Sequence, residues 1–318
     1  MKINEAVKLI KSAKTIALFS HINPDCDTIG SALALRAFLQ KAGKEVSVYC
    51  DGELKFDMKE LPTAGSLNAD PIQVSYDLCI AVDCAAEDRI GDFIGVFRKG
   101  KKTLCVDHHL QDRLYAEHNL IDPKSGATAE LVYLIMNEYD PALIDREIAS
   151  LLYTALVTDT GNFGFSNTGV RTLQIGSALL SYGVANAEIS YKHFREIPFD
   201  TFKLKARCLG KAQFFEGNRI GILTFMKEDF DATGTSSANT SNLVNEIVNI
   251  AGVDIAVSVT EIRKNAYKIS VRTQGNVDAN AIAATFGGGG HKNAAGFMIN
   301  GFYGNLIDDI LKACKDNL

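Results

Sequence analysis

The chain has 318 residues, 47% hydrophobic and 22% charged, with 33 Lys and Arg against 38 Asp and Glu and a formal net charge of −5. This length provides one large domain or two ordinary ones, and the composition excludes disordered, fibrous and membrane-spanning proteins. The acidity argues against a protein that coats long nucleic acids, while leaving open small anionic substrates bound at a local cationic site.

In the first half, short β-rich runs alternate with stretches of helical periodicity. We expect strands over residues 15–21, 45–50, 77–84 and 102–109, and helices over residues 27–41, 127–139 and 146–157. Continuous apolar strands separated by helices indicate a buried, mostly parallel sheet with helices on both faces. The first half is therefore predicted to be an α/β domain, over residues 1–185.

Around residues 181–205 the periodicity weakens and Pro198 interrupts it, so residues 186–204 are predicted to be a connector. Beyond it we expect a smaller α/β domain with a mixed sheet, over residues 205–318. Its predicted strands are 219–226, 253–262 and 267–273, and its predicted helices are 240–252, 278–287 and 304–317. Residues 1–190 carry a net charge of −7 and residues 191–318 a net charge of +2, which suits a metal centre paired with an anion-binding surface.

Acids and histidines cluster where the predicted strands of the first domain end. They are His21, Asp25, Asp27, Asp83, Asp107, His108, His109 and, after a later apolar segment, Asp159. Ligands of open parallel sheets bind beyond the carboxyl ends of the strands, so these side chains are expected at one edge. A single acid of this kind can equally be a helix N-cap, and Asp27 is open to that interpretation.

Four or five carboxylates brought together would repel one another unless cations neutralised them. Mixed Asp and His ligands favour Mn²⁺, Fe²⁺, Co²⁺ or Zn²⁺ over Mg²⁺. The number of ligands exceeds what one ion needs, so we expect two divalent ions about 3.5–4 Å apart that share a bridging carboxylate.

Near the C-terminus, four glycines at 287–290 precede His291. We expect this tetraglycine to lie outside helix and strand interiors, and to allow close backbone approach with N–H groups turned toward an anion. A flexible hinge is the alternative. Arg272 favours the anion site because a guanidinium suits phosphate, and Ser270 and Thr273 flank it with hydroxyls.

The ordered motifs HINPDCDTIGS, AVDCA, VDHH and TDTGNF resemble those of the DHH phosphoesterase superfamily. GGGGHKNAAGF and SVRTQG resemble the DHH-associated second domain, so the whole chain is similar to the nano-RNase A type of two-domain enzyme. The resemblance implies hydrolysis of short oligoribonucleotides to 5′-mononucleotides and of 3′-phosphoadenosine-5′-phosphate (pAp) to AMP. It also implies two divalent ions, with Mn²⁺ favoured.

Carried onto this sequence, the resemblance implies one ion held by His21, Asp25 and Asp83, and another held by Asp27, Asp83, His108 and Asp159. Asp83 would bridge the ions, Asp107 would orient its neighbours, and His109 would face the substrate phosphate. In the second domain the terminal 5′-phosphate would be held by Arg272, by Gly288, Gly289 and Gly290, and by His291, with Ser270 and Thr273 as further candidates.

An alternative within the superfamily is a phosphodiesterase of cyclic or linear dinucleotides, and a less favoured one is a scaffold without catalysis. The seven cysteines include no CxxC pair, the N-terminus lacks a signal pattern, and no stretch approaches ~18 uninterrupted apolar residues. We therefore expect a cytoplasmic protein that has no membrane partner and uses short RNA and pAp as substrates. The same reasoning allows a homodimer.

Overall fold

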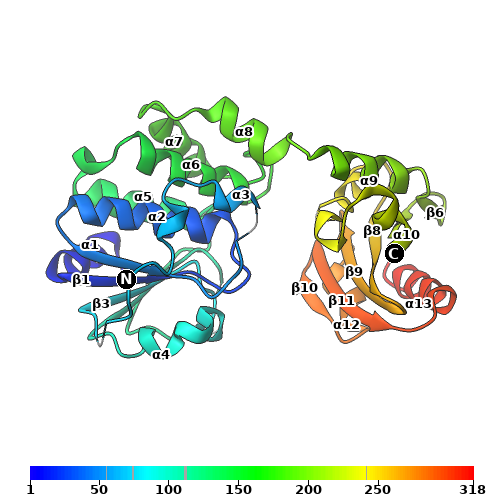
Figure 1. Cartoon of the computed structure of the whole chain (residues 1–318), viewed down its shortest axis with the longest axis horizontal. Coiled ribbons are helices and arrows are strands. Elements are labelled where there is room, and N and C mark those ends of the chain that lie inside the picture. The colour runs from blue at the N-terminus through cyan, green and yellow to red at the C-terminus, as the bar shows by residue number, and fades with distance from the viewer. Residues whose placement is uncertain (55, 74, 111–112, 241) are drawn as a thin grey trace. The chain divides into compact units, whose positions relative to one another are not determined.

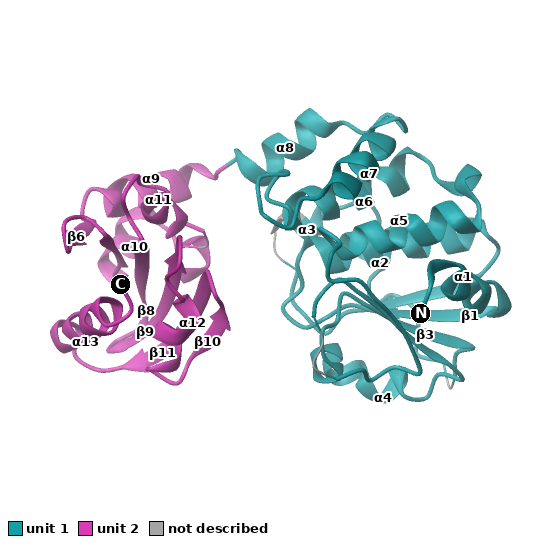
Figure 2. Cartoon of the chain, turned by 180° about the vertical axis from the view of Figure 1, so that it is seen from behind, with its two compact units in different colours: residues 1–196 teal, residues 197–318 magenta. Residues whose placement is uncertain are grey.

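The computed structural model describes residues 1–318 apart from residues 55, 74, 111–112 and 241. The chain forms two compact units, Met1–Glu196 and Ile197–Leu318 (Figure 2). The expected connector, residues 186–204, is largely helical: α8 (Asn186–Phe194) belongs to unit 1, and α9 (Phe199–Leu209) begins unit 2.

Unit 1 is built on a parallel sheet with the strand order β2-β1-β3-β4-β5. The strands are β1 (Thr15–Phe19), β2 (Glu45–Tyr49), β3 (Leu78–Val82), β4 (Thr103–Asp107) and β5 (His118–Ile121). The order changes direction between β1 and β3, where a doubly wound sheet opens a crevice for ligands. The first four strands match the predicted ones with earlier ends, whereas β5 lacks an apolar run and was not predicted.

Helices cover both faces of this sheet (Figure 1). One face packs on α1 (Ile3–Ser12), α2 (Cys26–Lys41), α5 (Thr128–Tyr139) and α6 (Arg146–Asp159), with α7 (Val170–Leu180) and α8 outside them. The other face packs on a 3₁₀ turn (Glu87–Phe93) and on α4 (Ile94–Phe97). Alternation along β1 explains both contacts: Leu18 enters the first core, and Ala17 and Phe19 enter the second.

Shorter elements complete unit 1: α3 (Phe56–Lys59) and 3₁₀ turns at Ala64–Ser66 and Pro141–Leu143. The close packing of α2 on α6 depends on Gly30, because a Cβ there would lie 2.9 Å from the Leu151 carbonyl oxygen and 3.1 Å from Ala155 Cβ. This contact matters for the site, because α2 begins and α6 ends at the edge where the acids gather.

Unit 2 is a smaller α/β unit with a mixed sheet in the order β10-β11-β9-β8-β7-β6. Only β7 and β8 pair in parallel among its described strands. The strands are β6 (Gln213–Phe215), β7 (Ile220–Phe225), β8 (Ile255–Arg263), β9 (Ala266–Thr273), β10 (Gly289–His291) and β11 (Ala294–Asn300). The predicted fold class, two α/β domains with a parallel and then a mixed sheet, is confirmed.

Two helical layers enclose the second sheet. One consists of α9, α10 (Lys227–Thr233) and α11 (Asn245–Val248), with a 3₁₀ turn at Ser237–Thr240, and the other of α12 (Ala279–Ala284) and α13 (Tyr303–Lys315). The long helix expected over 240–252 is shorter in the structure, and residue 241 lies outside the described residues.

The tetraglycine segment departs from the expectation that it avoids strand interiors. Gly289 and Gly290 lie in β10, an edge strand paired only with β11. A Cβ at Gly288 or Gly290 would overlap the backbone of β11, and Gly290 has a φ of 155°, which favours glycine. Here the close backbone approach is to a neighbouring strand.

All seven cysteines are buried, and none forms a disulfide in the described part of the chain. Among the described residues, no helix combines the length and the apolar character needed to cross a membrane.

Candidate metal centre and anion site

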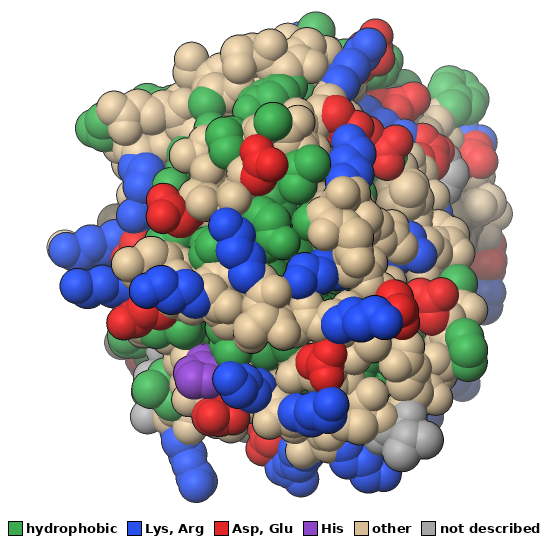
Figure 3. Space-filling view, turned by 90° about the vertical axis from the view of Figure 1, so that its left-hand side faces the viewer, with side chains coloured by type: hydrophobic (Ala, Val, Ile, Leu, Met, Phe, Trp, Pro, Cys, Tyr) green, Lys and Arg blue, Asp and Glu red, His purple; other side chains and the backbone are tan. Residues whose placement is uncertain are grey.

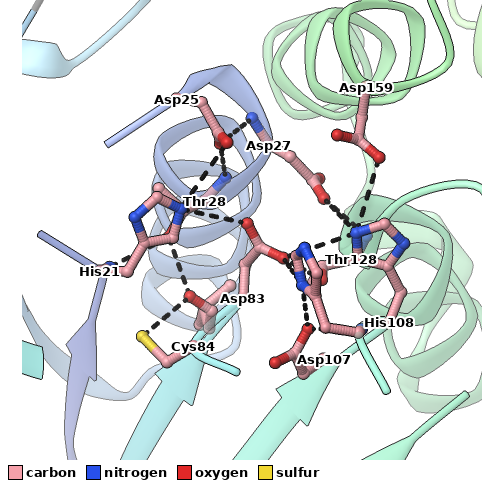
Figure 4. Close-up of polar contacts among 12 residues, drawn as sticks. His21, Asp25, Asp27, Thr28, Asp83, Cys84, Asp107, His108, Thr128 and Asp159 are labelled. Carbon is pink, nitrogen blue, oxygen red and sulfur yellow. Dashed lines mark hydrogen bonds and ion pairs between the residues drawn. The ribbon is translucent and has the colours of Figure 1, made fainter. Parts of the chain in front are cut away.

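The predicted acids and histidines of unit 1 converge at the carboxyl edge of its sheet (Figure 4). His21 follows β1, Asp25 and Asp27 stand at the start of α2, Asp83 follows β3, and Asp159 ends α6. Asp107 ends β4 and is followed by His108 and His109. Their ligand atoms form three groups, each within 4.8 Å: His21, Asp25 and Asp83; Asp27, His108 and Asp159; and Asp83, His108 and His109.

Asp83 lies at the centre of these groups and presents one oxygen to each side. Its Oδ2 is 3.5 Å from His21 Nε2, whereas its Oδ1 is 3.8 Å from His108 Nε2. The carboxylate is 1% exposed, and its residue adopts a φ of 60°, a conformation that non-glycine residues rarely take. The turn after β3 therefore holds a buried carboxylate between two sets of ligand atoms.

Of the two acids at the start of α2, Asp25 is the residue that caps the helix. Asp25 Oδ1 accepts the N–H groups of Asp27 and Thr28. Asp27 does not cap its own helix: its carboxylate accepts the N–H groups of Thr128 at 2.7 Å and Ala129 at 3.0 Å, in the first turn of α5. The positive end of the α5 dipole thus stabilises the Asp27 carboxylate, although Thr128 lies 101 residues further along the sequence.

His108 faces the second side of the centre with an unsatisfied nitrogen. Its Nδ1 lies 3.1 Å from the Ser125 carbonyl oxygen, which leaves Nε2 as the available ligand atom. Nε2 is buried and has no hydrogen-bond partner, while Asp159 Oδ2 lies at 3.5 Å and Asp27 Oδ2 at 3.9 Å. Buried polar atoms are rarely left unpaired, so this nitrogen fits a metal ligand.

Asp107 is fully buried and accepts hydrogen bonds from His109. Its Oδ1 accepts hydrogen bonds from the backbone N–H of His109 at 2.9 Å and from its ring Nδ1 at 2.8 Å. The imidazole is thereby oriented with Nε2 directed away from Asp107, and its side chain is 34% exposed. Asp107 is thus placed to orient a neighbour, and His109 to face a ligand.

The electrostatics of the centre favour the binding of positive charge. Burial, with the charge of Asp83, raises the pKa of Asp27 well above its usual range, and burial raises the pKa of Asp159 to about 6. Burial lowers the pKa of His21, but contacts with Asp25 and Asp83 outweigh it, and the pKa rises to about 9. The centre therefore favours protons on several groups, a role that divalent cations would take over.

Residues that the sequence did not single out complete the centre. Thr128 Oγ1 donates to Asp83 Oδ1 at 2.8 Å, and Asn167 Nδ2 donates to the Asp159 backbone oxygen at 3.1 Å. Arg89 Nη2 lies 3.1 Å from His21 Nδ1, at the edge of the centre. No sequence motif predicts these contacts, although Asn167 and Thr128 both follow glycine-containing turns.

Lysines gather at the opposite edge of the same sheet. Lys14, Lys44 and Lys102 stand directly before β1, β2 and β4. Figure 3 shows Lys and Arg side chains spread over the face that carries α1. Acids lie among these lysines, since Glu45 is 3.6 Å from Lys14 and Asp77 is 2.9 Å from Lys101, so this edge carries paired charges of both signs.

In unit 2 the structure brings together some of the predicted anion-binding residues. The register places His291, Ala294 and Arg272 side by side on β10, β11 and β9, and places Gly289 beside Gly296 and Ser270. Paired residues present their side chains on one face, so Arg272 and His291 flank a floor of small residues. Arg272 is half-buried, has its pKa lowered by burial, and pairs with no carboxylate among the described residues.

Thr273, Gly288 and Gly290 make hydrogen bonds within unit 2 that direct them away from the candidate anion site. Thr273 lies on the opposite face of β9 from Arg272, and its hydroxyl donates to the carbonyl oxygens of Val277 and Lys292. The N–H of Gly288 donates to the Ala283 oxygen, and that of Gly290 to Asn280 Oδ1. The face with Arg272, His291 and Ser270 thus remains as the candidate anion site, with Gly289 beside Ser270.

Comparison with known families finds two matches. Residues 15–156 match the DHH family, N-terminal domain, and residues 222–318 match the DHHA1 domain. The first match spans the segments that carry most of the acidic centre, and the second contains β8, β9, β10 and β11.

Several known proteins are similar over nearly the whole chain. The bifunctional oligoribonuclease and PAP phosphatase NrnA of Thermus thermophilus is 30% identical over 99% of this chain and 93% of its own. The protein of the same name from Bacillus subtilis is 26% identical over 98% of this chain and 99% of its own. The crystal structure of an exopolyphosphatase-related protein from Bacteroides fragilis superposes with a TM-score of 0.91 at 26% identity, covering 99% of this chain and 95% of the other.

Proposed function

Because the chain belongs to the DHH family, among the two-domain enzymes of the NrnA type, we propose that it hydrolyses short oligoribonucleotides to 5′-mononucleotides and pAp to AMP. The strongest support within the structure is the Asp83 carboxylate, whose two oxygens face separate sets of ligand atoms. This arrangement suits a phosphoester hydrolase that uses two cations.

We assign one divalent ion to His21, Asp25 and Asp83, and the other to Asp27, Asp83, His108 and Asp159. Mn²⁺ suits this mixture of carboxylate and imidazole ligands. When bound, such ions make water a nucleophile near neutral pH and stabilise charge on phosphoryl oxygens. The unpaired Nε2 of His108 and the raised pKa of Asp159 both support cation binding here.

The remaining residues bind and orient the substrate. His109, held by Asp107, would donate a hydrogen bond to a phosphoryl oxygen, and Arg272 with His291 in unit 2 would bind a terminal phosphate. One reaction then serves both substrates: water attacks phosphorus, and the bond to the nucleoside 3′-oxygen breaks. In a dinucleotide this bond belongs to the internal phosphodiester, and in pAp it belongs to the 3′-phosphate.

A substrate panel tests the proposal. Purified protein with Mn²⁺ is incubated with 5′-labelled RNAs of two to about ten nucleotides, with pAp and with cyclic dinucleotides. We expect 5′-mononucleotides from the shortest RNAs and AMP from pAp, and no turnover once a chelator is added. Faster hydrolysis of a cyclic dinucleotide would favour the alternative phosphodiesterase. Absence of all turnover in folded, Mn²⁺-loaded protein would overturn the proposal and favour a scaffold.

The cellular setting is part of the proposal. The buried cysteines, without a disulfide in the described residues, support a reducing compartment and hence the cytoplasm. The homodimer allowed by the sequence stays a prediction.

A further inference from the structure

The loop at residues 122–128, between β5 and α5, contacts both halves of the metal centre. The Ser125 carbonyl oxygen receives His108 Nδ1, Thr128 donates its N–H to Asp27 Oδ2, and its hydroxyl donates to Asp83 Oδ1. Three proposed ligands are thus oriented by one short segment. Such outer contacts fix the tautomer and direction of metal ligands.

This loop is held from behind by Glu130, a fully buried carboxylate. Glu130 Oε1 accepts the N–H of Gly126 at 2.8 Å and the hydroxyl of Thr172 at 2.6 Å, and its Oε2 accepts Arg171 Nε at 2.9 Å. The carboxylate therefore connects the loop, its own helix α5 and the start of α7.

Arg171 fastens the loop at two further points. Its Nη2 donates to Asp122 Oδ2 at 2.8 Å, where the loop begins, and to Ser125 Oγ at 2.6 Å, in the residue that orients His108. The planar guanidinium thereby spans three acceptors: Asp122, Ser125 and Glu130. A lysine ammonium is a single point of charge and cannot span the same set.

A contribution to folding stability alone does not explain the ion pair between Arg171 and Glu130. Burying an ion pair costs desolvation energy that its attraction often fails to offset, and an apolar replacement is frequently as stable. A fixed geometry is what such a pair provides, and here it fixes Ser125, whose carbonyl oxygen receives His108 Nδ1. Asn167 adds to this, since its Nδ2 donates to the Gly126 oxygen and to the Asp159 backbone.

We propose that Arg171 and Glu130 are positioning residues that clamp the loop at 122–128 and thereby hold His108, Asp27 and Asp83 in the geometry that binds divalent ions. The proposal rests on the proposed function of the centre. Because the two residues are proposed to act on ion binding, their effect can be measured directly as the affinity for Mn²⁺, without an assay of hydrolysis.

The test is calorimetric titration of chelator-treated full-length protein with Mn²⁺, with folding followed by circular dichroism and thermal melting. Arg171→Lys and Arg171→Gln should raise the dissociation constant for Mn²⁺ by roughly 10- to 100-fold, the scale for outer contacts of metal ligands. Ser125→Ala keeps the carbonyl that receives His108 and loses only the hydroxyl, so it should raise the constant by a smaller factor.

The matched control is Arg207→Gln in unit 2. Arg207 is 40% exposed and pairs with the buried Asp229, much as Arg171, 39% exposed, pairs with the buried Glu130. The control should bind Mn²⁺ as the unaltered protein does. Folded Arg171→Lys and Ser125→Ala proteins with unchanged Mn²⁺ affinity would overturn the clamp. If Arg171→Gln fails to fold, these two variants decide. Failure of the unaltered protein to bind Mn²⁺ would instead overturn the proposed function.

Discussion

Asp107 accepts two hydrogen bonds from His109 on one oxygen, from the backbone N–H at 2.9 Å and from ring Nδ1 at 2.8 Å. Because Asp107 is fully buried and contacts the His109 ring, we expect it to act on the substrate through the imidazole that it orients. The hydrogen bonds with Asp107 and Asp83 raise the pKa of His109 to about 11.

Asp107→Ala should therefore lower kcat/KM for a dinucleotide by roughly 10- to 100-fold through misorientation of His109. A double-mutant cycle with His109→Ala checks the route: in the His109→Ala background, the Asp107 substitution should cost little more. Independent, additive losses would show that Asp107 acts by another path.

Asp83→Ala removes the carboxylate that faces both sets of ligand atoms. Hydrolysis of RNA and pAp should fall to background, and Mn²⁺ titration should show fewer ions bound per chain, because both proposed ions lose a ligand. The control is Asp231→Ala, a largely exposed carboxylate of unit 2. Retention of a tenth of the activity by Asp83→Ala would contradict the bridging role.

Arg272→Ala tests the anion site of unit 2. The loss of a charged hydrogen bond to phosphate should weaken kcat/KM for 5′-phosphorylated substrates by ~1.5–3 kcal/mol, and a small generic phosphodiester far less. Arg263→Ala, on the exposed end of β8, is the matched arginine control. Equal losses on both kinds of substrate would place Arg272 in catalysis or in folding instead of terminal-phosphate binding.

The sequence predicts the main strands and the gathering of the acids, because His21, Asp83, Asp107 and Asp159 each follow a local apolar run. Parallel strands end at one edge, and that rule places His21, Asp83 and His108 together without knowledge of any contact. The fold class follows from the same alternation of strand and helix patterns.

What the sequence does not predict depends on contacts between distant residues. The pairing of Asp27 with the first turn of α5, and of Arg171 with Glu130, joins segments 101 and 41 residues apart. The strands β5, β6, β10 and β11 were not predicted. The edge strand β5 lacks an apolar run, and the edge strand β10 consists of two glycines and a histidine. Their extended form comes from pairing with β4 and β11.

Divalent ions should stabilise unit 1 selectively, because all their proposed ligands lie there. At a free Mn²⁺ concentration 100 times its dissociation constant, binding contributes about 2.7 kcal/mol to the native state. Hydrogen exchange with mass spectrometry checks this: Mn²⁺ should slow exchange in peptides from residues 1–196 and leave those from residues 197–318 unchanged. Slowing confined to unit 2 would contradict the assigned site.

Unit 2 should lose stability in acid through Asp229, a 1% exposed carboxylate beside Arg207 and Lys211. Burial raises the pKa of Asp229, but the hydrogen bonds from Lys211 and Arg207 outweigh it, so the folded-state pKa lies below the usual value. A depressed pKa stabilises the folded state above the unfolded-state pKa of about 3.9, and this stabilisation is lost as the pH falls through the folded value.

Asp229→Asn should thus be less stable than the unaltered protein by roughly 1–3 kcal/mol near neutral pH, with the difference shrinking as the pH falls below the unfolded-state pKa. Urea unfolding at a series of pH values measures it. Asp231→Asn, whose partner Lys227 is 75% exposed, is the control and should show almost no difference at any pH. A difference for Asp229→Asn that stayed constant or grew in acid would show that packing, and not the charge of this carboxylate, stabilises unit 2.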